Sequence, residues 1–325
     1  MIRAAESGLF LDTVRSVHPD HHSVLRLRCP LCNGRLAEER RCDSCDFLMS
    51  EKDGIVLALP PDRLAHYANF IADYEYIRAA EGRGSQDKSY YLALPYQDTT
   101  GHNSGQWKIR ARSYDYLIRR VLKPFAAGNA VLDLGAGNCW LSFQLAQQGY
   151  RPVAVDLLTN SQDGLGAATH YQHDLGSTIP RFQAELDCLP FQDGQFDAVI
   201  FNASFHYSED YEATLLEALR CSKSDGFVVI CDTPWYSREQ SGRQMVAERR
   251  AYFCDRFHTT SDSVKSQEFL TDERLRSLGD ALSIRWTVHR PWHGWRWAMR
   301  PWVARLRQRR EPSQFRIYVA RKDDH

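Results

Sequence analysis

Short apolar runs alternate with segments of helical periodicity from the middle of this chain to its end. Seven of these runs have the length and composition of strands, at 131–134, 152–156, 181–185, 196–201, 226–232, 283–289 and 314–320. Between them, apolar residues recur at helical spacing, as in 141–148 and 211–221. Short apolar strands that alternate with helices indicate a sheet covered on both faces. We therefore predict an α/β fold with a seven-stranded, mostly parallel sheet.

The segment before the first of these strands has another pattern. Helices are predicted over 62–80 and 109–122, the second of them ended by Pro124. The loop between them is rich in aromatic residues, which either close over a site as a lid or pack against the core. Residues 27–60 end in a short apolar strand stopped by two prolines. The predicted organisation is an N-terminal extension (1–26), a cysteine-rich module (27–60), linker helices with a lid (61–122) and a main domain (123–325) with insertions at 236–282 and 291–312.

Charge and cysteine usage narrow the classes of function. The chain holds 41 basic and 41 acidic residues, so its net charge gives no argument for binding nucleic acid or an acidic membrane. No apolar run approaches the ~20 residues that cross a bilayer, and the N-terminal stretch is a poor signal peptide. The nine cysteines form one group of four and five isolated positions, which suits a reducing compartment. We expect a cytoplasmic protein.

The four grouped cysteines have the spacing of a metal site. Cys29 and Cys32 form one C-x-x-C pair, and Cys42 and Cys45 form a second pair after nine intervening residues. Two such turns on a short hairpin place four thiolates tetrahedrally, which suits Zn²⁺. A redox dithiol is the alternative, but no thioredoxin-like unit surrounds these residues. The sequence resembles a zinc ribbon, and a closed four-thiolate shell predicts a structural metal rather than a catalytic one.

A glycine-rich turn, VLDLGAGNCW at 131–140, follows the first predicted strand of the main domain. The dinucleotide pattern GxGxxG is absent, because Trp140 stands three residues after Gly137. Asp133 lies two residues before Gly135, where a carboxylate would repel a pyrophosphate but would suit a ligand with an ammonium group. No GxxxxGK[ST] motif is present in the sequence either. These features favour a cationic small ligand.

This turn resembles motif I of the class I, Rossmann-like methyltransferases that use S-adenosyl-L-methionine, with a core of the type 11 kind. The resemblance implies that Gly135 and Gly137 let the backbone approach the methionine part of the cofactor. It implies that Asp133 helps to hold the ammonium group and that Asp156, at the next strand end, binds the ribose hydroxyls. Leu157 would pack on the adenine.

The segment LPFQDGQFD at 189–197 extends the resemblance, because LPFxDxxFD is common among members of this family that act on small molecules. Alignment on LPF places Glu185 where an acid usually meets the adenine amino group, and Leu186 where a backbone N–H is offered. Asp187 is a rival for the acidic role, because the register before LPF can slip.

Methyl transfer is an in-line displacement, so alignment and a dry pocket matter more than acid–base groups. The segment 202–210 follows the fourth strand and resembles the part of the family fold beneath the reactive methyl group. Asn202 is predicted to position cofactor or substrate. His206 is the candidate general base, with a structural role as the alternative. Tyr96, in the predicted lid, is a further catalytic candidate.

The insertion at 291–312 mixes arginine and tryptophan. Its members are Arg296, Arg300, Arg305, Arg307, Arg309, Arg310, Trp292, Trp295, Trp297 and Trp302. Such mixtures bind RNA or lie at a membrane surface. A helix that buries its tryptophans and exposes its arginines is the remaining alternative.

Three functions are consistent with these motifs. The leading one is a methyltransferase for a small molecule or metabolite, with S-adenosyl-L-methionine as methyl donor and a structural Zn²⁺. The second is an RNA-base methyltransferase, because a zinc ribbon before a class I domain is distantly similar to bacterial rRNA guanine methyltransferases; the ribbon itself is not basic. The third is a non-catalytic zinc-ribbon scaffold. The oligomeric state is not predicted.

Overall fold

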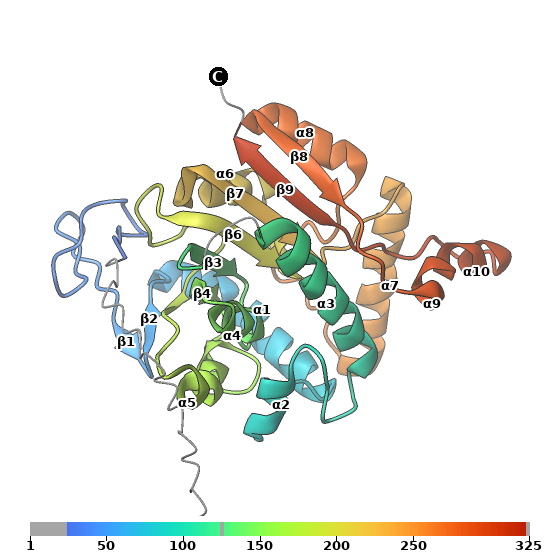
Figure 1. Cartoon of the computed structure of the whole chain (residues 1–325), viewed down its shortest axis with the longest axis horizontal. Coiled ribbons are helices and arrows are strands. Elements are labelled where there is room, and N and C mark those ends of the chain that lie inside the picture. Colours follow the sequence, from blue (N-terminus) through green and yellow to red (C-terminus); the bar gives the residue numbers. More distant parts are fainter. Residues whose placement is uncertain (1–24, 124–126, 323–325) are drawn as a thin grey trace, which may run out of the picture.

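A single nine-stranded sheet forms the centre of the computed structural model, which describes residues 25–123 and 127–322 (Figure 1). The strand order is β1-β2-β5-β4-β3-β6-β7-β9-β8. The strands are β1 (Glu51–Lys52), β2 (Ile55–Leu57), β3 (Ala130–Leu134), β4 (Arg151–Asp156), β5 (Arg181–Gln183), β6 (Phe196–Asn202), β7 (Ser222–Cys231), β8 (Ile284–His289) and β9 (Ile317–Lys322). Most of the predicted N-terminal extension and Pro124 lie outside the described residues.

The prediction of seven strands was wrong in number, although all seven predicted runs contribute strands. The two additional strands come from the cysteine-rich module, where β1 and β2 form an antiparallel hairpin. β2 then pairs in parallel with β5, with Ile55 opposite Arg181, and so extends the main sheet. The strands from β2 to β7 are parallel, and β9 is inserted antiparallel between β7 and β8. The prediction of a mostly parallel sheet is confirmed.

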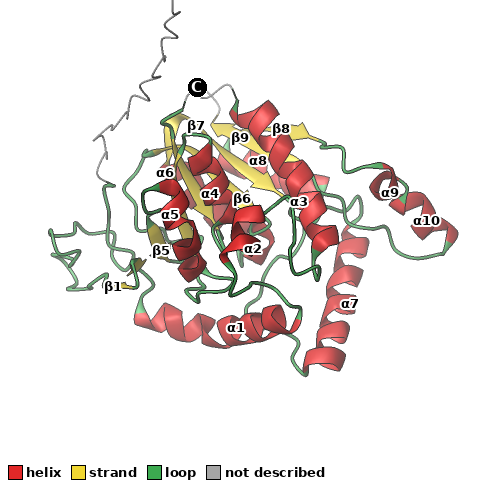
Figure 2. Ribbon diagram, turned by 60° about the horizontal axis from the view of Figure 1, so that its bottom comes forward, coloured by secondary structure: helices red, strands yellow, loops and turns green. Residues whose placement is uncertain are grey.

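Helices cover both faces of the sheet (Figure 2). The α-helices are α1 (Pro61–Ala80), α2 (Lys88–Ala93), α3 (Ser104–Tyr116), α4 (Trp140–Gln147), α5 (Gln172–Leu175), α6 (Tyr211–Cys221), α7 (Glu239–Phe257), α8 (Asp272–Leu282), α9 (Trp295–Ala298) and α10 (Arg300–Leu306). A π-helical turn, η1 (Leu117–Leu122), prolongs α3, and η2 (Leu165–Tyr171) and η3 (Phe205–Tyr207) are 3₁₀ helices. Successive strand residues point to opposite faces, so Leu132 packs in the core beneath α6 and α8 while Val131 packs beneath α3 and α4.

Three aromatic residues of the predicted lid, Tyr90, Tyr91 and Trp107, pack in the core. Tyr90 and Tyr91 on α2 are 2% and 0% exposed, and Trp107 on α3 meets Trp140 edge to face at 5.7 Å. Tyr96 is exposed and donates a hydrogen bond to Asp115. Burial of large aromatic side chains contributes strongly to stability, so this segment belongs to the body of the fold.

The arginine- and tryptophan-rich insertion leaves the body as a helical arm, α9 and α10, between β8 and β9 (Figure 1). The alternative in which it buries its tryptophans is wrong for Trp295 and Trp302, which are 77% and 64% exposed. Trp297 is half-buried and lies 5.3 Å from Phe315, ring centre to ring centre. Among the described residues, no helix has the length and apolar character that crossing a bilayer requires.

Candidate active site and cysteine cluster

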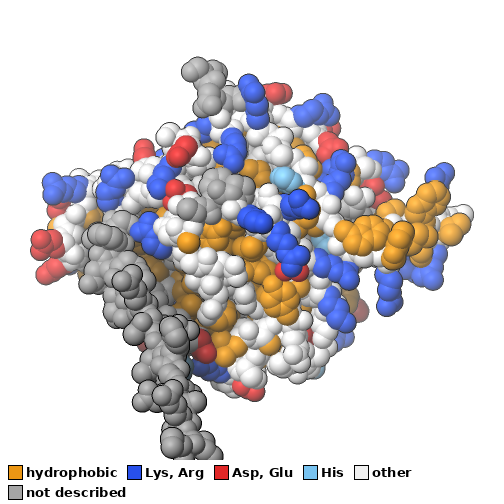
Figure 3. Space-filling view, viewed as in Figure 1, with side chains coloured by type: hydrophobic (Ala, Val, Ile, Leu, Met, Phe, Trp, Pro, Cys, Tyr) orange, Lys and Arg blue, Asp and Glu red, His pale blue; other side chains and the backbone are white. Residues whose placement is uncertain are grey.

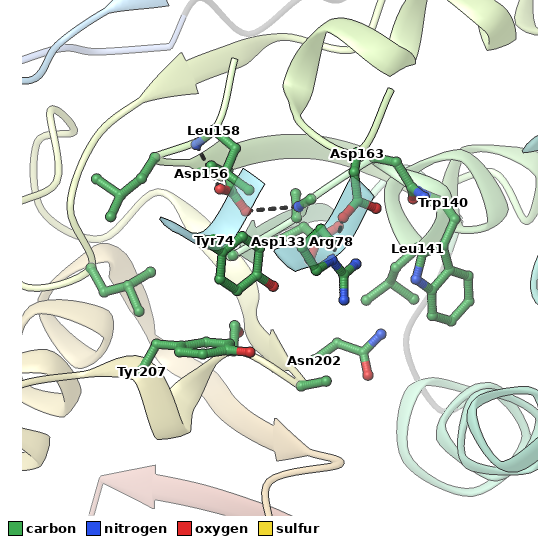
Figure 4. Close-up of a pocket in the computed structure, with 18 of the residues that line it drawn as sticks. Tyr74, Arg78, Asp133, Trp140, Leu141, Asp156, Leu158, Asp163, Asn202 and Tyr207 are labelled. Atoms are coloured by element: carbon green, nitrogen blue, oxygen red, sulfur yellow. Dashed lines mark hydrogen bonds and ion pairs between the residues drawn. The ribbon is translucent and has the colours of Figure 1, made fainter. Parts of the chain in front are cut away.

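A cavity of about 850 Å³, open to solvent, lies at the carboxyl ends of β3, β4 and β6. In an α/β sheet this is where ligands bind. Its lining includes seven residues predicted from the sequence, which are Asp133, Gly135, Gly137, Asp156, Leu157, Leu186 and Asn202. Figure 4 shows Asp156 and Asp163 on one side of this first cavity and Asn202 and Tyr207 on the other.

The glycine-rich turn has a backbone that requires glycine at its start. Gly135 has φ of 72°, and a Cβ atom there would lie 2.2 Å from the Cβ of Ser204. Gly137 also has a positive φ, of 52°. Cys139 adopts the left-handed conformation with φ of 60° immediately before α4 begins. A left-handed conformation in a non-glycine residue is uncommon and often marks a functional turn.

Two carboxylates that face the cavity have raised pKa values. Asp133 is 1% exposed and accepts a hydrogen bond from the hydroxyl of Ser142 at 2.7 Å. Burial raises the pKa of its carboxyl to about 7, although the bond from Ser142 acts in the opposite direction. Asp156 accepts from the backbone N–H groups of Gly137 and Leu158, both at 2.8 Å, and burial raises its pKa to about 6. Asp156 therefore connects the glycine-rich turn to the end of β4.

Helix α1 supplies one wall of the first cavity through Phe70, Tyr74 and Arg78. The guanidinium of Arg78 forms a short ion pair with Asp163, which also lines the cavity. The sequence showed the helical stripe of α1 but not which part of the molecule it faces. These residues were therefore missed, because their contacts join segments 85 positions apart.

Arg110 on α3 also faces the first cavity, although no motif in the sequence points to it. Its guanidinium lies 5.0 Å from the ring centre of Trp107, and within the described ranges it has no ion-pair partner. Burial and the neighbouring Arg78 and Arg83 lower the pKa of Arg110. An anionic group of a ligand would supply the missing counter-charge.

Glu185 lies outside the lining of the first cavity. Its carboxylate pairs with Arg63 of α1, with Nη2–Oε2 at 2.6 Å, and accepts from the hydroxyl of Tyr67 at 3.1 Å. Glu185 and its rival Asp187 line a smaller recess of about 380 Å³, which shares Leu157 and Leu186 with the first cavity. The acid therefore fixes the N-terminal half of α1 to the sheet.

A second cavity of about 820 Å³ adjoins the first. The two share four lining residues, Phe70, Tyr74, Arg78 and Tyr207, so they lie next to each other. Met245, Arg249 and Phe253 of α7 and Glu268 of the following loop form its other wall. Arg249 pairs with Glu268.

His206 lies in the second cavity, whereas Tyr96 lines neither cavity. Burial, together with Arg110 and Arg249, lowers the pKa of the His206 imidazole to about 3, so the ring is neutral near pH 7. Its Nδ1 atom and the Nε atom of Arg249 are buried and have no hydrogen-bond partner within the part of the chain that is described. Buried polar atoms of this kind are usually satisfied by a partner, which here would be a ligand or water.

The four grouped cysteines converge in the structure as the spacing predicts. Their sulfur atoms all lie within 4.8 Å of one another, with 3.5 Å between Cys29 and Cys45 and 3.4 Å between Cys32 and Cys42. Tetrahedral Zn²⁺ with Zn–S bonds of about 2.3 Å separates its sulfur ligands by about 3.8 Å. A Cβ atom at Gly34 would lie 3.1 Å from two of these sulfur atoms. The cluster therefore has the donor set and the size for a zinc ion.

Comparison with known proteins identifies the central part of the fold. Residues 132–230 match the family described as a methyltransferase domain. The chain therefore contains a methyltransferase domain, and the first cavity lies at the strand ends of that domain.

Curated relatives with this domain include a demethylmenaquinone methyltransferase of Corynebacterium efficiens, which is 32% identical over 126 residues, covering 39% of this chain and 47% of the relative. A malonyl-[acyl-carrier protein] O-methyltransferase of Geobacter sulfurreducens is 28% identical over 158 residues, covering 48% and 52%. The chain thus spans about half the length of the curated relatives it matches.

Among solved structures, a phosphoethanolamine N-methyltransferase 2 of Haemonchus contortus in complex with S-adenosyl-L-methionine aligns with a TM-score of 0.47 at 15% identity, covering 74% of this chain and 61% of that chain.

Proposed function

We propose that this protein is an S-adenosyl-L-methionine-dependent methyltransferase for a small molecule, with the cofactor in the first cavity and the acceptor in the second. The observation that carries the proposal is the pair of adjacent cavities. The first is lined by a motif I turn and its two acids, and the second has an aromatic lining. The curated relatives are named for small or carrier-bound acceptors, which supports an acceptor of this size.

The residues of the first cavity fit the parts of this cofactor. Asp133 would pair with the ammonium group and Arg110 with the carboxylate, since each offers the opposite charge. Asp156 would accept from the ribose hydroxyls, as acids at this strand end do in related nucleotide sites. Leu157 and Leu186 would pack on the adenine. When bound, the cofactor supplies a methyl group on a sulfonium sulfur.

Glu185 has a different role in this proposal. Its carboxylate is held by Arg63 and Tyr67, so it would order α1 as a wall of the cavity rather than contact the adenine itself. The backbone N–H of Leu186 would then remain as the polar contact to the base.

The lining of the second cavity indicates the chemistry of the acceptor. Phe70, Tyr74, Tyr207 and Phe253 offer aromatic surface, and Arg249 is neutralised by Glu268. An acceptor that is largely apolar or aromatic, with one polar group, fits this lining. That polar group would satisfy the buried nitrogen atoms of Arg249 and His206.

We propose that the chain's own residues act mainly by alignment and by exclusion of water. Tyr207 lines both cavities and Asn202 lines the first, and the two would orient the acceptor toward the cofactor. His206, neutral because of its lowered pKa, would hydrogen-bond to the acceptor and would remove a proton only from an acidic one.

The cysteine cluster would hold one structural Zn²⁺. Four thiolates close the coordination shell, so the metal would stabilise the turns of residues 29–45 and leave the chemistry to the cavities.

The cofactor site is tested by calorimetry with S-adenosylhomocysteine. Asp156→Asn should weaken binding by about tenfold or more, because it removes a charged acceptor from the ribose position. Asp280→Asn, at an exposed position on α8, is the matched control and should bind as the wild type does. Equal affinity of the wild type and both variants would remove this cofactor site and favour the non-catalytic scaffold.

A further inference from the structure

The arm formed by α9 and α10 exposes an apolar stripe. The stripe consists of Trp292 (58% exposed), Trp295 (77%), Met299 (50%), Trp302 (64%), Val303 (42%) and Leu306 (83%). Figure 3 shows this hydrophobic surface, rimmed by basic side chains, on the protruding arm. Contiguous apolar surface on a soluble protein usually marks an interaction site.

The arm is amphipathic along its whole length. From Trp295 the exposed apolar residues follow at intervals of three or four, apart from the adjacent pair Trp302 and Val303, which places them on one side of the turns of α9 and α10. The face toward the body carries Trp297, Pro301 and Ala304, which are half-buried. The outward face is therefore largely exposed to solvent.

Arginines flank the stripe on both sides. By helical spacing, Arg296 and Arg307 lie beside one edge of the stripe and Arg305 beside the other. These three and Arg309 are exposed and form no ion pair with any residue in the described ranges. Glu311 is the one acid of the whole 291–312 segment. The surface is thus apolar in the middle and positively charged at its margins.

The outward position of the stripe is fixed by contacts at the base of the arm. The guanidinium of Arg300 lies 3.7 Å from the ring centre of Trp297. Arg310 pairs with Glu248 of α7 at 2.6 Å, and Arg112 of α3 donates to the carbonyl of His293. These contacts hold the arm in a defined position relative to the body of the fold.

We propose that this arm docks on a lipid bilayer that contains anionic phospholipids. Tryptophan favours the boundary between headgroups and acyl chains, and apolar residues on the same face enter the acyl region. The flanking arginines would contact the phosphates of the headgroups. Single-stranded RNA would use aromatic stacking and arginine, but Met299, Val303 and Leu306 at the centre of the stripe add nothing to such binding.

Vesicle sedimentation of the full chain tests this proposal without reference to enzymatic activity. The wild type should bind vesicles of phosphatidylcholine mixed with phosphatidylglycerol, and bind pure phosphatidylcholine more weakly. Trp302→Ser with Leu306→Ser should reduce the partition coefficient by about tenfold or more, because it removes apolar surface that would be buried. Arg305→Gln with Arg309→Gln should reduce binding to the anionic vesicles by about tenfold and leave pure phosphatidylcholine unaffected.

Leu216→Ser is the matched control, because Leu216 is 59% exposed on α6, away from the arm. It should bind vesicles as the wild type does. The altered side chains are exposed, so unchanged melting curves are expected and would exclude misfolding as the cause.

Three results would overturn the proposal. The first is no vesicle binding by the wild type, or equal binding by the wild type and the Trp302→Ser/Leu306→Ser variant. The second is binding of poly(U) RNA that depends on Arg305 and Arg309, without vesicle binding. The third is a dimer of the wild type that the Trp302→Ser/Leu306→Ser variant abolishes, again without vesicle binding, which would assign the stripe to a second copy of the chain.

Discussion

Three acidic and two basic side chains face the first cavity, and their charges do not balance. Asp163 is neutralised by Arg78, and within the described part of the chain Asp133, Asp156 and Arg110 form no ion pair. The raised pKa values of the two remaining acids reflect their burial. A ligand with an ammonium and a carboxylate group would pair with Asp133 and Arg110, and it would leave Asp156 to accept hydrogen bonds from hydroxyl groups.

The affinity for S-adenosylhomocysteine should fall as the pH falls below about 7. The pKa of Asp133 is raised to about 7, so the carboxylate becomes protonated in that range and no longer attracts the ammonium group. The dissociation constant should therefore rise by up to about tenfold per pH unit below the pKa. Calorimetry at a series of pH values between about pH 6 and pH 8 would measure this change in the dissociation constant.

Asp133→Asn is the control for this titration, because it should bind more weakly than the wild type above the pKa of Asp133, approach the wild-type affinity below that pKa, and lose most of the pH dependence. An unchanged slope in this variant would show that another group is responsible. The pKa of Asp156 is raised to about 6, so protonation of this carboxylate should weaken binding further below that pH.

Residues whose roles follow from a local motif could be predicted from the sequence, and residues whose roles follow from tertiary pairing could not. The glycine-rich turn and Asp156, at the end of β4, lie within residues 131–156, and the structure places them in one cavity. The partner of Glu185, in contrast, is Arg63, 122 positions earlier in the chain. No sequence pattern links those two residues.

At the scale of secondary structure, helix α1 could be predicted from the sequence, but its place in the fold could not. The periodicity of residues 62–80 predicted a helix correctly, but its position across the cavity depends on its pairing with Glu185 and Asp163. The aromatic segment after it was ambiguous between lid and core, because burial of tyrosine is decided by tertiary packing. Most strands of the main domain were predictable because they are short apolar runs, whereas residues 181–185 (RFQAE) hold only two apolar residues and give a weaker signal.

The turns that carry the cysteines should depend on a metal. We expect one zinc per chain by elemental analysis, lost when Cys29→Ser and Cys42→Ser are combined. Because metal binding is coupled to folding in such modules, the melting temperature of that variant should fall by about 5 °C or more. Cys254→Ser, at an exposed cysteine of α7, is the matched control and should retain the metal. A metal-free wild type with the same melting temperature would contradict this prediction.

At the scale of the whole molecule, the two cavities and the arm belong to one connected body. Asp232, at the end of β7, accepts a hydrogen bond from Ser113 of α3, and that hydroxyl lies 3.1 Å from Nε2 of His293 at the base of the arm. Helix α7 lines the second cavity with Met245 and pairs with the arm through Glu248. The base of the arm is therefore connected to the end of β7, the strand next to β6.

The parallel pairing of β2 with β5 means that the N-terminal module protects a sheet edge from other molecules. A chain shortened to begin at Pro60 would leave the backbone of β5 unpaired on one side and would remove the ion pair of Arg28 with Glu217. Unpaired edge strands recruit strands from neighbouring chains, so this protein should aggregate, as light scattering would show. A chain that begins at Leu25 retains the edge strands and should stay dispersed. The cysteine-rich segment would thus prevent self-association. A chain that begins at Pro60, stays dispersed and has the melting temperature of the wild type would contradict this prediction.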